Sequence, residues 1–242
     1  MKVKNIFILA AMSLTLASCS DLFEPADENN RGLDEIYNEP TYAQGLLGYG
    51  YAMLPYNTKS VTDIATDDAV SNDLTNSFLK MATGSWTANS DPMSRWANGR
   101  ACIQYLNIFL QEVDKVNWAK DENARRMYCD SRKGEAYALR ALNLYYLLMN
   151  HGGWTADGKL LGVPNLTEPE TSTDDFNKPR NTFQECLDQI YSDLDEAAKL
   201  LPLDYNDLTD DNDVPAKYKE IGVKTAGDYN RVFGSIMRGR IS

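Results

Sequence analysis

Apolar side chains recur at helical spacing along most of the chain. Rows of this kind predict helices over residues 41–54, 94–116, 181–201 and 225–242. The clearest row repeats at intervals of three, four or seven residues and is formed by Trp96, Ile103, Leu106, Leu110 and Val113. Each row leaves the opposite face polar, so each helix is expected to bury one side against a neighbour.

Residues 121–150 have a different pattern. From Gly134 onward, apolar residues lie on nearly every side of the predicted helix: Ala136, Leu139, Leu142, Leu144, Tyr145, Leu147 and Leu148. A helix that is apolar all round is buried, so this one is expected in the middle of the packing. Gly152 and Gly153 end it, and His151 is interpreted as a cap at the helix end.

Sequence signals also mark helix ends. The spacing of a capping box occurs at Thr41 with Gln44, Thr182 with Glu185, and Thr225 with Asp228. Pro202 stops the helix over 181–201. The last apolar row is still running at Ser242, so we expect the natural protein to be longer.

These helices pair along the chain into hairpins, 94–116 with 121–150 and 181–201 with 225–242. Stacked hairpins are the tetratricopeptide arrangement, although no strict repeat of fixed period occurs here. The polar segments 55–92 and 152–180 are expected to be irregular. The predicted fold class is mainly α, with tetratricopeptide-like helical hairpins and long irregular loops.

The N-terminus has the pattern of a leader for export. Lys2 and Lys4 precede an apolar run, 6–16, which is too short to span a bilayer as a mature helix. The Leu-Ala-Ser-Cys string ending at Cys19 resembles the bacterial lipobox, in which the cysteine receives a diacylglycerol. We therefore expect a signal peptide over 1–18, a lipidated tether over 19–38 and a helical domain over 39–242. The alternative is an ordinary signal peptide with a chance cysteine.

The charge of the chain excludes some partners. Removing residues 1–18, which hold two lysines and no acid, changes the net charge from −11 to −13. Such a surface repels phosphate backbones, so no nucleic-acid partner is expected. It also repels anionic lipid, so the membrane is expected to be reached through the lipid anchor only.

Three cysteines remain after Cys19. Cys102, Cys129 and Cys186 each lie beside apolar residues in predicted helices, which favours buried thiols. A bridge between Cys102 and Cys129 is the alternative, because both belong to one predicted hairpin. No zinc-binding spacing occurs, and no metal ligands are assigned.

A series of motifs in a fixed order resembles the SusD/RagB family of outer-membrane nutrient-binding lipoproteins. The pieces are Cys19, then Trp96, Ile103 and Asn107, then Gly134-Glu135-Ala136-Tyr137-Ala138-Leu139-Arg140-Ala141, Tyr145, Leu147, Gly162-Val163-Pro164, Pro179-Arg180-Asn181-Thr182, Ile190, Asp193, Leu194, Ala197 and Leu201-Pro202. The resemblance covers residues 40–240 and is to the N-terminal portion of such proteins.

The resemblance implies a binding protein that catalyses no reaction. Such proteins are lids on a SusC-type TonB-dependent outer-membrane transporter, to which they deliver an oligosaccharide or, in some members, a peptide. It implies an outer-membrane location, lipid-anchored and facing outward. The helices would serve as scaffold and face the transporter, while the loops carry ligand contacts.

The loop over 84–98 has the residue types that bind sugars. Aromatic rings stack on sugar C–H faces, and amides and carboxylates bind hydroxyls. The candidate ligand-binding residues are Trp86, Asn89, Asp91, Trp96 and Asn98, with Trp154 as a further candidate. The alternative, which the helical row favours for Trp96, is that both Trp86 and Trp96 pack against the first hairpin.

Other polar residues have simpler interpretations. One acidic cluster contains Asp63, Asp67, Asp68 and Asp73, and a second contains Asp207, Asp210, Asp211 and Asp213. Either can hold calcium in principle, but neither has the EF-hand pattern, so solvated loops are expected and no cofactor is assigned. Arg140, inside an apolar helix, is expected to pair with Glu135 or with a carboxylate on a neighbouring helix.

Two functions of other classes stay open. A surface glycoside hydrolase needs two carboxylates in a cleft, and no pattern sets them there. No nucleophile elbow, Walker loop or zinc-protease motif occurs, so no catalytic residue is assigned. The other alternative is a helical-repeat adaptor that binds only proteins.

Overall fold

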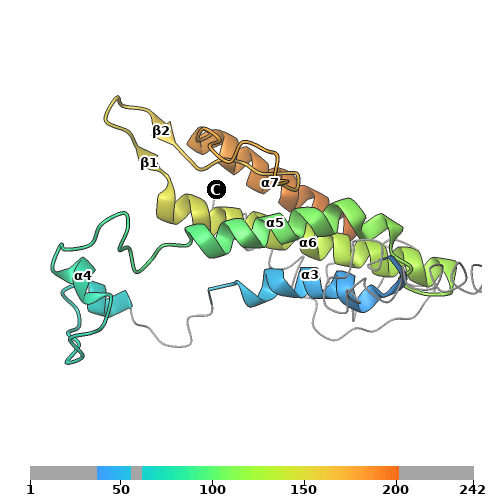
Figure 1. Ribbon diagram of the computed structural model, residues 1–242, viewed down its shortest axis with the longest axis horizontal. Coiled ribbons are helices and arrows are strands. Elements are labelled where there is room, and N and C mark those ends of the chain that lie inside the picture. The colour runs from blue at the N-terminus through green and yellow to red at the C-terminus, as the bar shows by residue number, and fades with distance from the viewer. Residues whose placement is uncertain (1–36, 56–61, 202–242) are drawn as a thin grey trace, which may run out of the picture. The chain divides into compact units, whose positions relative to one another are not determined.

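The computed structural model describes residues 37–55 and 62–201. They belong to one compact unit, Ile36–Ser242. The long helices are α3 (Pro40–Ala52), α5 (Trp96–Glu112), α6 (Glu122–His151) and α7 (Phe183–Leu200). The shorter elements are the 3-10 helices η1 (Thr62–Ala65) and η2 (Val113–Lys115), helix α4 (Leu79–Ala82), and strands β1 (Gly153–Trp154) and β2 (Leu160–Leu161) (Figure 1). The mainly α class is confirmed.

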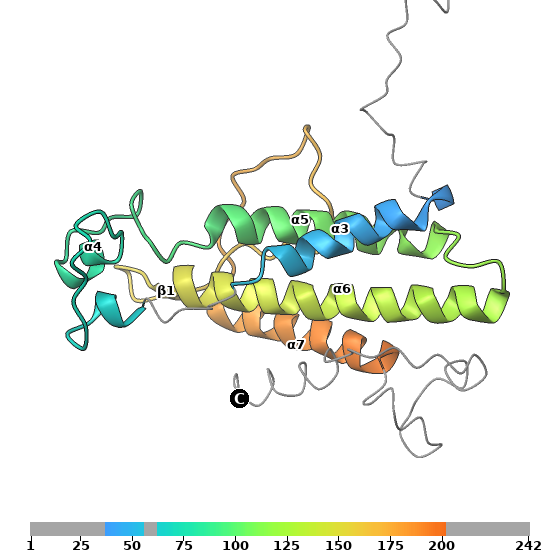
Figure 2. The ribbon, with the colours of Figure 1, turned by 90° about the horizontal axis from the view of Figure 1, so that it is seen from below.

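Helix α6 is the centre of the packing. It contacts α7, α5 and α3, and Figure 2 shows it between α7 on one side and α5 with α3 on the other. One buried cluster joins α6 to α7 through residues such as Leu144, Leu148 and Ile190. Another joins α3 and α5 through Leu47, Leu106 and Phe109. The expectation drawn from its all-round apolar pattern is confirmed.

Two of the three predicted capping boxes lie in the part of the chain that the structure describes. At α7 the Thr182 side chain accepts from the Glu185 amide, and the Glu185 carboxylate accepts from the Thr182 amide, so this capping box is confirmed. The box at Thr41 and Gln44 is wrong. Helix α3 begins at Pro40, after Glu39, which provides no side-chain cap. Proline fits the first helical turn because it has no amide to satisfy there.

The pairing of helices agrees with the prediction as far as the structure reaches. Helices α5 and α6 form the first hairpin, and α7 packs against α6. The expected helix over 225–242, its box at Thr225 and the second hairpin lie outside the described residues. No helix among the described residues has the length and apolar character needed to cross a bilayer.

The loops contain more structure than expected. The 55–92 segment includes η1 and α4, and the 152–180 segment includes an antiparallel pair in which Gly153 faces Leu161 and Trp154 faces Leu160. Gly158, with φ +77°, allows the turn between these strands. Each strand has 2 residues, which is too short to be predicted from an alternation of apolar and polar positions.

The cysteines in the described part of the chain are thiols. Cys102 and Cys186 are buried, and burial raises the pKa of Cys102 to about 12. The Cys129 thiol donates to the Val113 carbonyl. The alternative of a Cys102–Cys129 bridge is therefore wrong. Cys19 lies outside the described residues.

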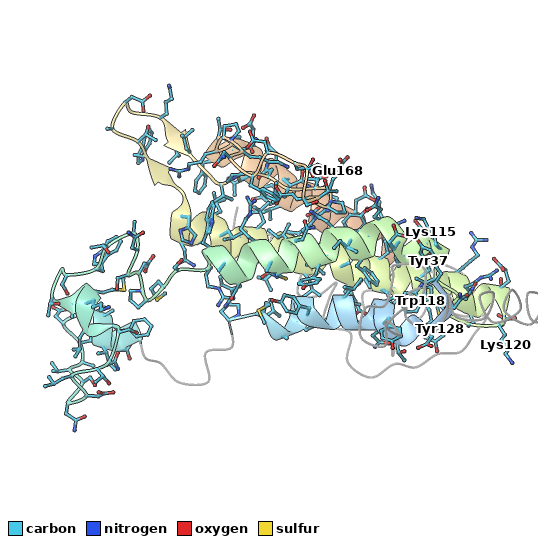
Figure 3. The ribbon with its side chains drawn as sticks, viewed as in Figure 1. Tyr37, Lys115, Trp118, Lys120, Tyr128 and Glu168 are labelled. Atoms are coloured by element: carbon cyan, nitrogen blue, oxygen red, sulfur yellow. The ribbon has the colours of Figure 1, made fainter. Side chains whose placement is uncertain are left out.

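Tyr37 is fixed to the end of α5, just before α3 begins. Its hydroxyl donates to Glu112, its carbonyl accepts from the Asn117 amide at 2.9 Å, and Lys115 lies 5.3 Å from its ring centre. Lys115 also pairs with Glu112 at 2.8 Å. Figure 3 shows Tyr37 and Lys115 side by side where α5 leads into α6. These contacts fix Tyr37 at the end of the helical unit where α5 leads into α6.

Candidate functional site

A buried ion pair joins the two helices with the most extensive contact. Arg140 of α6 donates to both carboxylate oxygens of Asp193 on α7, at 2.8 and 2.6 Å. Arg140 is 6% exposed and Asp193 1%. This confirms the expected partner on a neighbouring helix. Glu135, the other candidate, accepts instead from Arg132 and Tyr51.

The same network extends to the loop over 163–178. Arg140 donates to Asn107 at 2.9 Å and to the Thr167 carbonyl at 3.1 Å. The Asn107 amide donates to the carbonyls of Leu166 and Glu168. Because these bonds from Arg140 and Asn107 end on main-chain oxygens of the loop, they do not depend on which exposed side chains this part of the loop carries.

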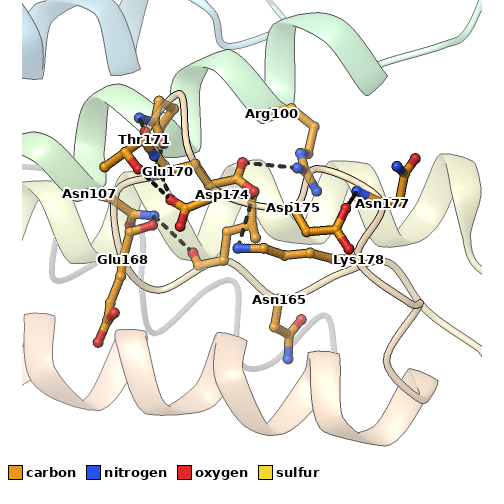
Figure 4. A network of polar contacts seen from close by, with 12 residues as sticks. Arg100, Asn107, Asn165, Glu168, Glu170, Thr171, Asp174, Asp175, Asn177 and Lys178 are labelled. Carbon is orange, nitrogen blue, oxygen red and sulfur yellow. Dashed lines mark hydrogen bonds and ion pairs between the residues drawn. The ribbon is translucent and has the colours of Figure 1, made fainter.

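Helix α5 holds the next residues of this loop. Gln104 exchanges two hydrogen bonds of 2.8 Å with the main chain of Glu170. The Glu170 carboxylate pairs with Arg100 at 3.1 Å and with Lys178 at 3.2 Å (Figure 4). The long loop is thus attached to the helices along much of its length.

Arg180 secures the β-hairpin. Its guanidinium donates to the carbonyls of Gly162 (2.7 Å), His151 (2.9 Å) and Leu161 (3.1 Å). One side chain thus binds three main-chain carbonyls. The hairpin that carries Trp154, 74% exposed, is therefore fixed to the end of α6.

Trp86 lies in a short ordered turn and offers its ring to solvent. Its amide donates to the Lys80 carbonyl at 3.2 Å, and a β-bridge joins Thr87 to Ser90. The side chain is 50% exposed, and Asn89 in the same turn is exposed as well. An exposed ring on an ordered turn suits stacking on a flat ligand face.

Trp96 has a different environment. It is the first residue of α5, and its ring meets His151 edge-on at 5.3 Å while Arg100 lies 5.6 Å from its centre. It is still 42% exposed. The packing interpretation therefore holds for part of this ring, and Arg100 links it to the loop network.

The remaining candidates are less closely grouped. Asp91 accepts from the Met93 amide at 2.8 Å and so closes its own turn, and Asn98 is exposed on α5. Within the described residues, no ring contact joins Trp86 to Trp96 or Trp154. The structure therefore places the Trp96 ring against His151, whereas the Trp86 ring is a separate exposed surface.

The acidic residues do not form a cation site in the described part of the chain. No group of three or more carboxylate, imidazole or thiol side chains gathers there. Asp73 accepts from Thr75, and Asp68 lies beside the Thr66 hydroxyl, so both join local turns. The cluster from Asp207 to Asp213 lies outside the described residues.

Comparison with known proteins gives the family. A family model described as starch-binding and associating with the outer membrane matches residues 33–216. The chain belongs to the SusD-like family. This agrees with the motif series in the sequence.

The SusD-like relatives are longer. The SusD-like protein P38 of Formosa agariphila is 29% identical over 224 residues, which cover 86% of this chain and 40% of that protein. A SusD-like protein of Bacteroides fragilis superposes with a TM-score of 0.57 at 18% identity, covering 80% of this chain and 36% of its own. A protein of Bacteroides vulgatus described as sugar binding gives 0.54 at 28% identity, with 69% and 38% covered. The chain thus spans about two fifths of the length of these relatives.

The SusD-like motifs acquire physical roles in this structure. Asn107, Arg140 and Asp193 form the buried network, and Arg180 holds the hairpin. Sequence reasoning did not assign Asn107 or Arg180 a contact, because most of their partners are main-chain carbonyls. The motif spacing alone was the signal that marked them.

His151 connects the start of α5 to the end of α6. The Arg95 amide donates to its Nε2 at 3.2 Å, so the ring must be unprotonated at that nitrogen. Gly152 is the helix cap, so interpreting the His151 side chain as a cap is wrong. Burial lowers the pKa of His151, and nearby Arg180 lowers it further while Asp91 opposes the change.

This environment predicts a loss of stability in mild acid. Below the ordinary histidine pKa of about 6.5, the unfolded chain binds a proton that the folded chain resists, so the free energy of unfolding falls as the pH falls. His151 is the single histidine of the chain. Denaturant titrations between about pH 7.5 and 5.5 should therefore show a steeper loss for the wild type than for His151→Gln. Parallel curves for the two proteins would contradict the prediction.

Proposed function

We propose that this chain is part of a cell-surface lipoprotein that binds an oligosaccharide and delivers it to a SusC-type TonB-dependent outer-membrane transporter. The family description supports sugar binding and association with the outer membrane. The observation that carries the ligand assignment to particular residues is Trp86, an exposed ring on an ordered turn that also contains the exposed Asn89. The chain acts by binding, and no catalytic residue is proposed.

Attachment to the membrane is proposed to depend on Cys19. Acylation of its thiol would hold the helical unit at the outer face of the outer membrane through a tether over 19–38. Each buried acyl CH₂ contributes about 0.8 kcal/mol, so several chains give a stable anchor without a membrane-spanning helix. Calcium is not required by this proposal.

The ligand is proposed to contact Trp86 together with Asn89 and Asp91, with Trp96 and Asn98 at the edge of the site. The Trp96 ring contacts His151 and Arg100, so less of its surface is free to contact a ligand. A bound peptide is the alternative within the same family. In that case the same rings would contact apolar side chains.

Removing the Trp86 ring tests the assignment. Trp86→Ala is expected to weaken oligosaccharide binding by about 1–3 kcal/mol, because a stacked ring at the centre of a site contributes that much. The measurement is calorimetry on the full-length protein with a panel of starch-derived and other oligosaccharides and of peptides. Phe176→Ala is the matched control, since Phe176 is an exposed ring (60%) on another loop.

The outcomes separate the candidates. Unchanged affinity in a folded Trp86→Ala protein would remove Trp86 from the site. Saturable binding of peptides but not of sugars would select the peptide alternative. If neither class binds while the transporter still co-purifies, the protein is an adaptor.

A further inference from the structure

The end of the helical unit at which α5 leads into α6 differs in charge from the rest of the chain. The chain as a whole has a net charge of −11. At this end Lys120 and Arg126 are exposed, and within the described ranges neither forms an ion pair. The Lys115 side chain is 54% exposed. Positive charge is therefore available here on an otherwise acidic protein.

The carboxylates at this end already have partners. Glu112 pairs with Lys115 at 2.8 Å, Asp114 with Lys133 at 2.6 Å, and Glu122 with Arg125. Asp121 accepts from the Ala124 amide as the cap of α6. Pairing reduces the negative potential that these acids would add to the surface. An approaching anion therefore meets mainly the unpaired cations.

A hollow opens among these residues. Its volume is about 320 Å³, and three cations line it: Lys115, Arg125 and Arg126. The acids Asp114, Glu122 and Asp130 also line it, together with Val116, Asn117 and Cys129. A hollow of this size and lining can admit a phosphate group beside Arg126, whose guanidinium suits phosphate oxygens.

Aromatic rings lie at the same end of the unit as the cations (Figure 3). Tyr37, Trp118 and Tyr128 are partly exposed, and Figure 3 shows them with Lys115 and Lys120 at the same end of the helices. Tyrosine and tryptophan combined with lysine and arginine are the residues enriched where proteins meet lipid headgroups. This composition suits contact with a membrane surface.

The number of residues between Cys19 and Tyr37 limits how far this end of the unit can lie from an anchored cysteine. Cys19 lies 18 residues before Tyr37, and Tyr37 is fixed at this end by Glu112 and Asn117. An extended chain of that length spans at most about 60 Å. A tether of limited reach keeps this surface close to the membrane, which raises the effective concentration of lipid that the surface meets.

We propose that the turn surface, defined as Lys115, Lys120, Arg125 and Arg126 with Tyr37, Trp118 and Tyr128, docks on the phosphate groups of an anionic lipid surface. The inference depends on the proposed anchoring at Cys19 for its effect in the cell, and it adds a second contact to the acyl anchor. Docking orients α6 with its N-terminal end toward the membrane. The Trp86 loop and the β-hairpin, which adjoin the start of α5 and the end of α6, then lie away from the lipid.

Vesicle binding tests the proposal. The protein is the full-length protein from residue 19 onward with Cys19→Ser, so that neither leader nor acyl chain contributes. It should co-sediment with vesicles of phosphatidylcholine and phosphatidylglycerol more than with phosphatidylcholine alone, and added salt should reduce the difference. Lys120→Glu combined with Arg126→Glu should lower the vesicle partition coefficient at least about tenfold, because each cation near an anionic surface adds to the attraction and the variant reverses two of them.

The matched control has the same net charge. Lys159→Glu combined with Lys199→Glu reverses two exposed lysines elsewhere, with side chains 71% and 66% exposed. It should change partitioning by less than about twofold, because those lysines lie outside the docking surface. Equal losses in both double variants, or equal binding to both vesicle types, would overturn the proposal. Palmitate labelling and ligand calorimetry are separate readouts, so failure of the anchor or of sugar binding is distinguishable from failure of this surface.

Discussion

Replacing Arg140 by methionine is expected to lower the free energy of unfolding by about 3–5 kcal/mol, because Asp193 then keeps a buried charge without its partner. Asp193 is 1% exposed and, among the residues that the structure describes, would retain only the Gln189 amide at 3.0 Å as a donor. Asn107 and the Thr167 carbonyl would each lose a donor as well. Denaturant titration of the wild type and the variant measures the loss.

A double variant separates the charge from the packing. Arg140→Met with Asp193→Leu removes both charges, and replacing a buried ion pair by apolar side chains is often close to neutral. We therefore expect the double variant to recover most of the stability. Arg126→Met on the same helix is the control, because Arg126 is exposed and should change stability by less than about 0.5 kcal/mol. A single variant as stable as the wild type would show that Asp193 is not buried as a charge.

Adding a single methyl group at Gly162 is expected to cost about 3 kcal/mol, near the upper end for an overpacked core. A Cβ there would overlap the Cys186 sulfur and lie 3.1 Å from both the Thr182 carbonyl oxygen and a Leu148 methyl. Cys186 is fully buried, and the Thr182 carbonyl belongs to the capped start of α7. Neither neighbour has room to move, so Gly162→Ala should separate β2 from α7.

The obstructing sulfur can itself be removed. In a Cys186→Ala background, Gly162→Ala should cost less than about 1 kcal/mol, and the difference between the two backgrounds is the coupling energy of a double-mutant cycle. Gly48→Ala is the control, because nothing lies within 4 Å of its Cβ position and alanine favours a helix. Equal costs in both backgrounds would show that the sulfur is not the obstacle.

The helices were predictable because their signals are local. Apolar spacing alone placed α5, α6 and α7, and it marked α6 as the central helix. The capping box at Thr182 depends on residues three apart and was also predictable. The failure at Thr41 arose because Pro40 fixes its own backbone and starts the helix earlier.

The contacts of the site were only partly predictable. An antiparallel hairpin of 94–116 with 121–150 places the start of one helix beside the end of the other, so the Trp96–His151 contact could have been inferred. The hydrogen bonds from Asn107 and Gln104 could not have been inferred. Their acceptors include main-chain carbonyls of the loop, and this group is the same in every residue type. Exposure of Trp86 likewise depends on how its turn folds.

The attachment of the 163–178 loop through its backbone has a consequence for protein engineering and for changes of this sequence in evolution. Gln104, Asn107 and Arg140 bind the loop through its backbone at Leu166, Thr167, Glu168 and Glu170. Side chains beyond that stretch, from 171 to 177, are mostly exposed and can be exchanged without breaking those bonds. This stretch is therefore a site where new recognition sequences can be grafted while the helices keep their own stability.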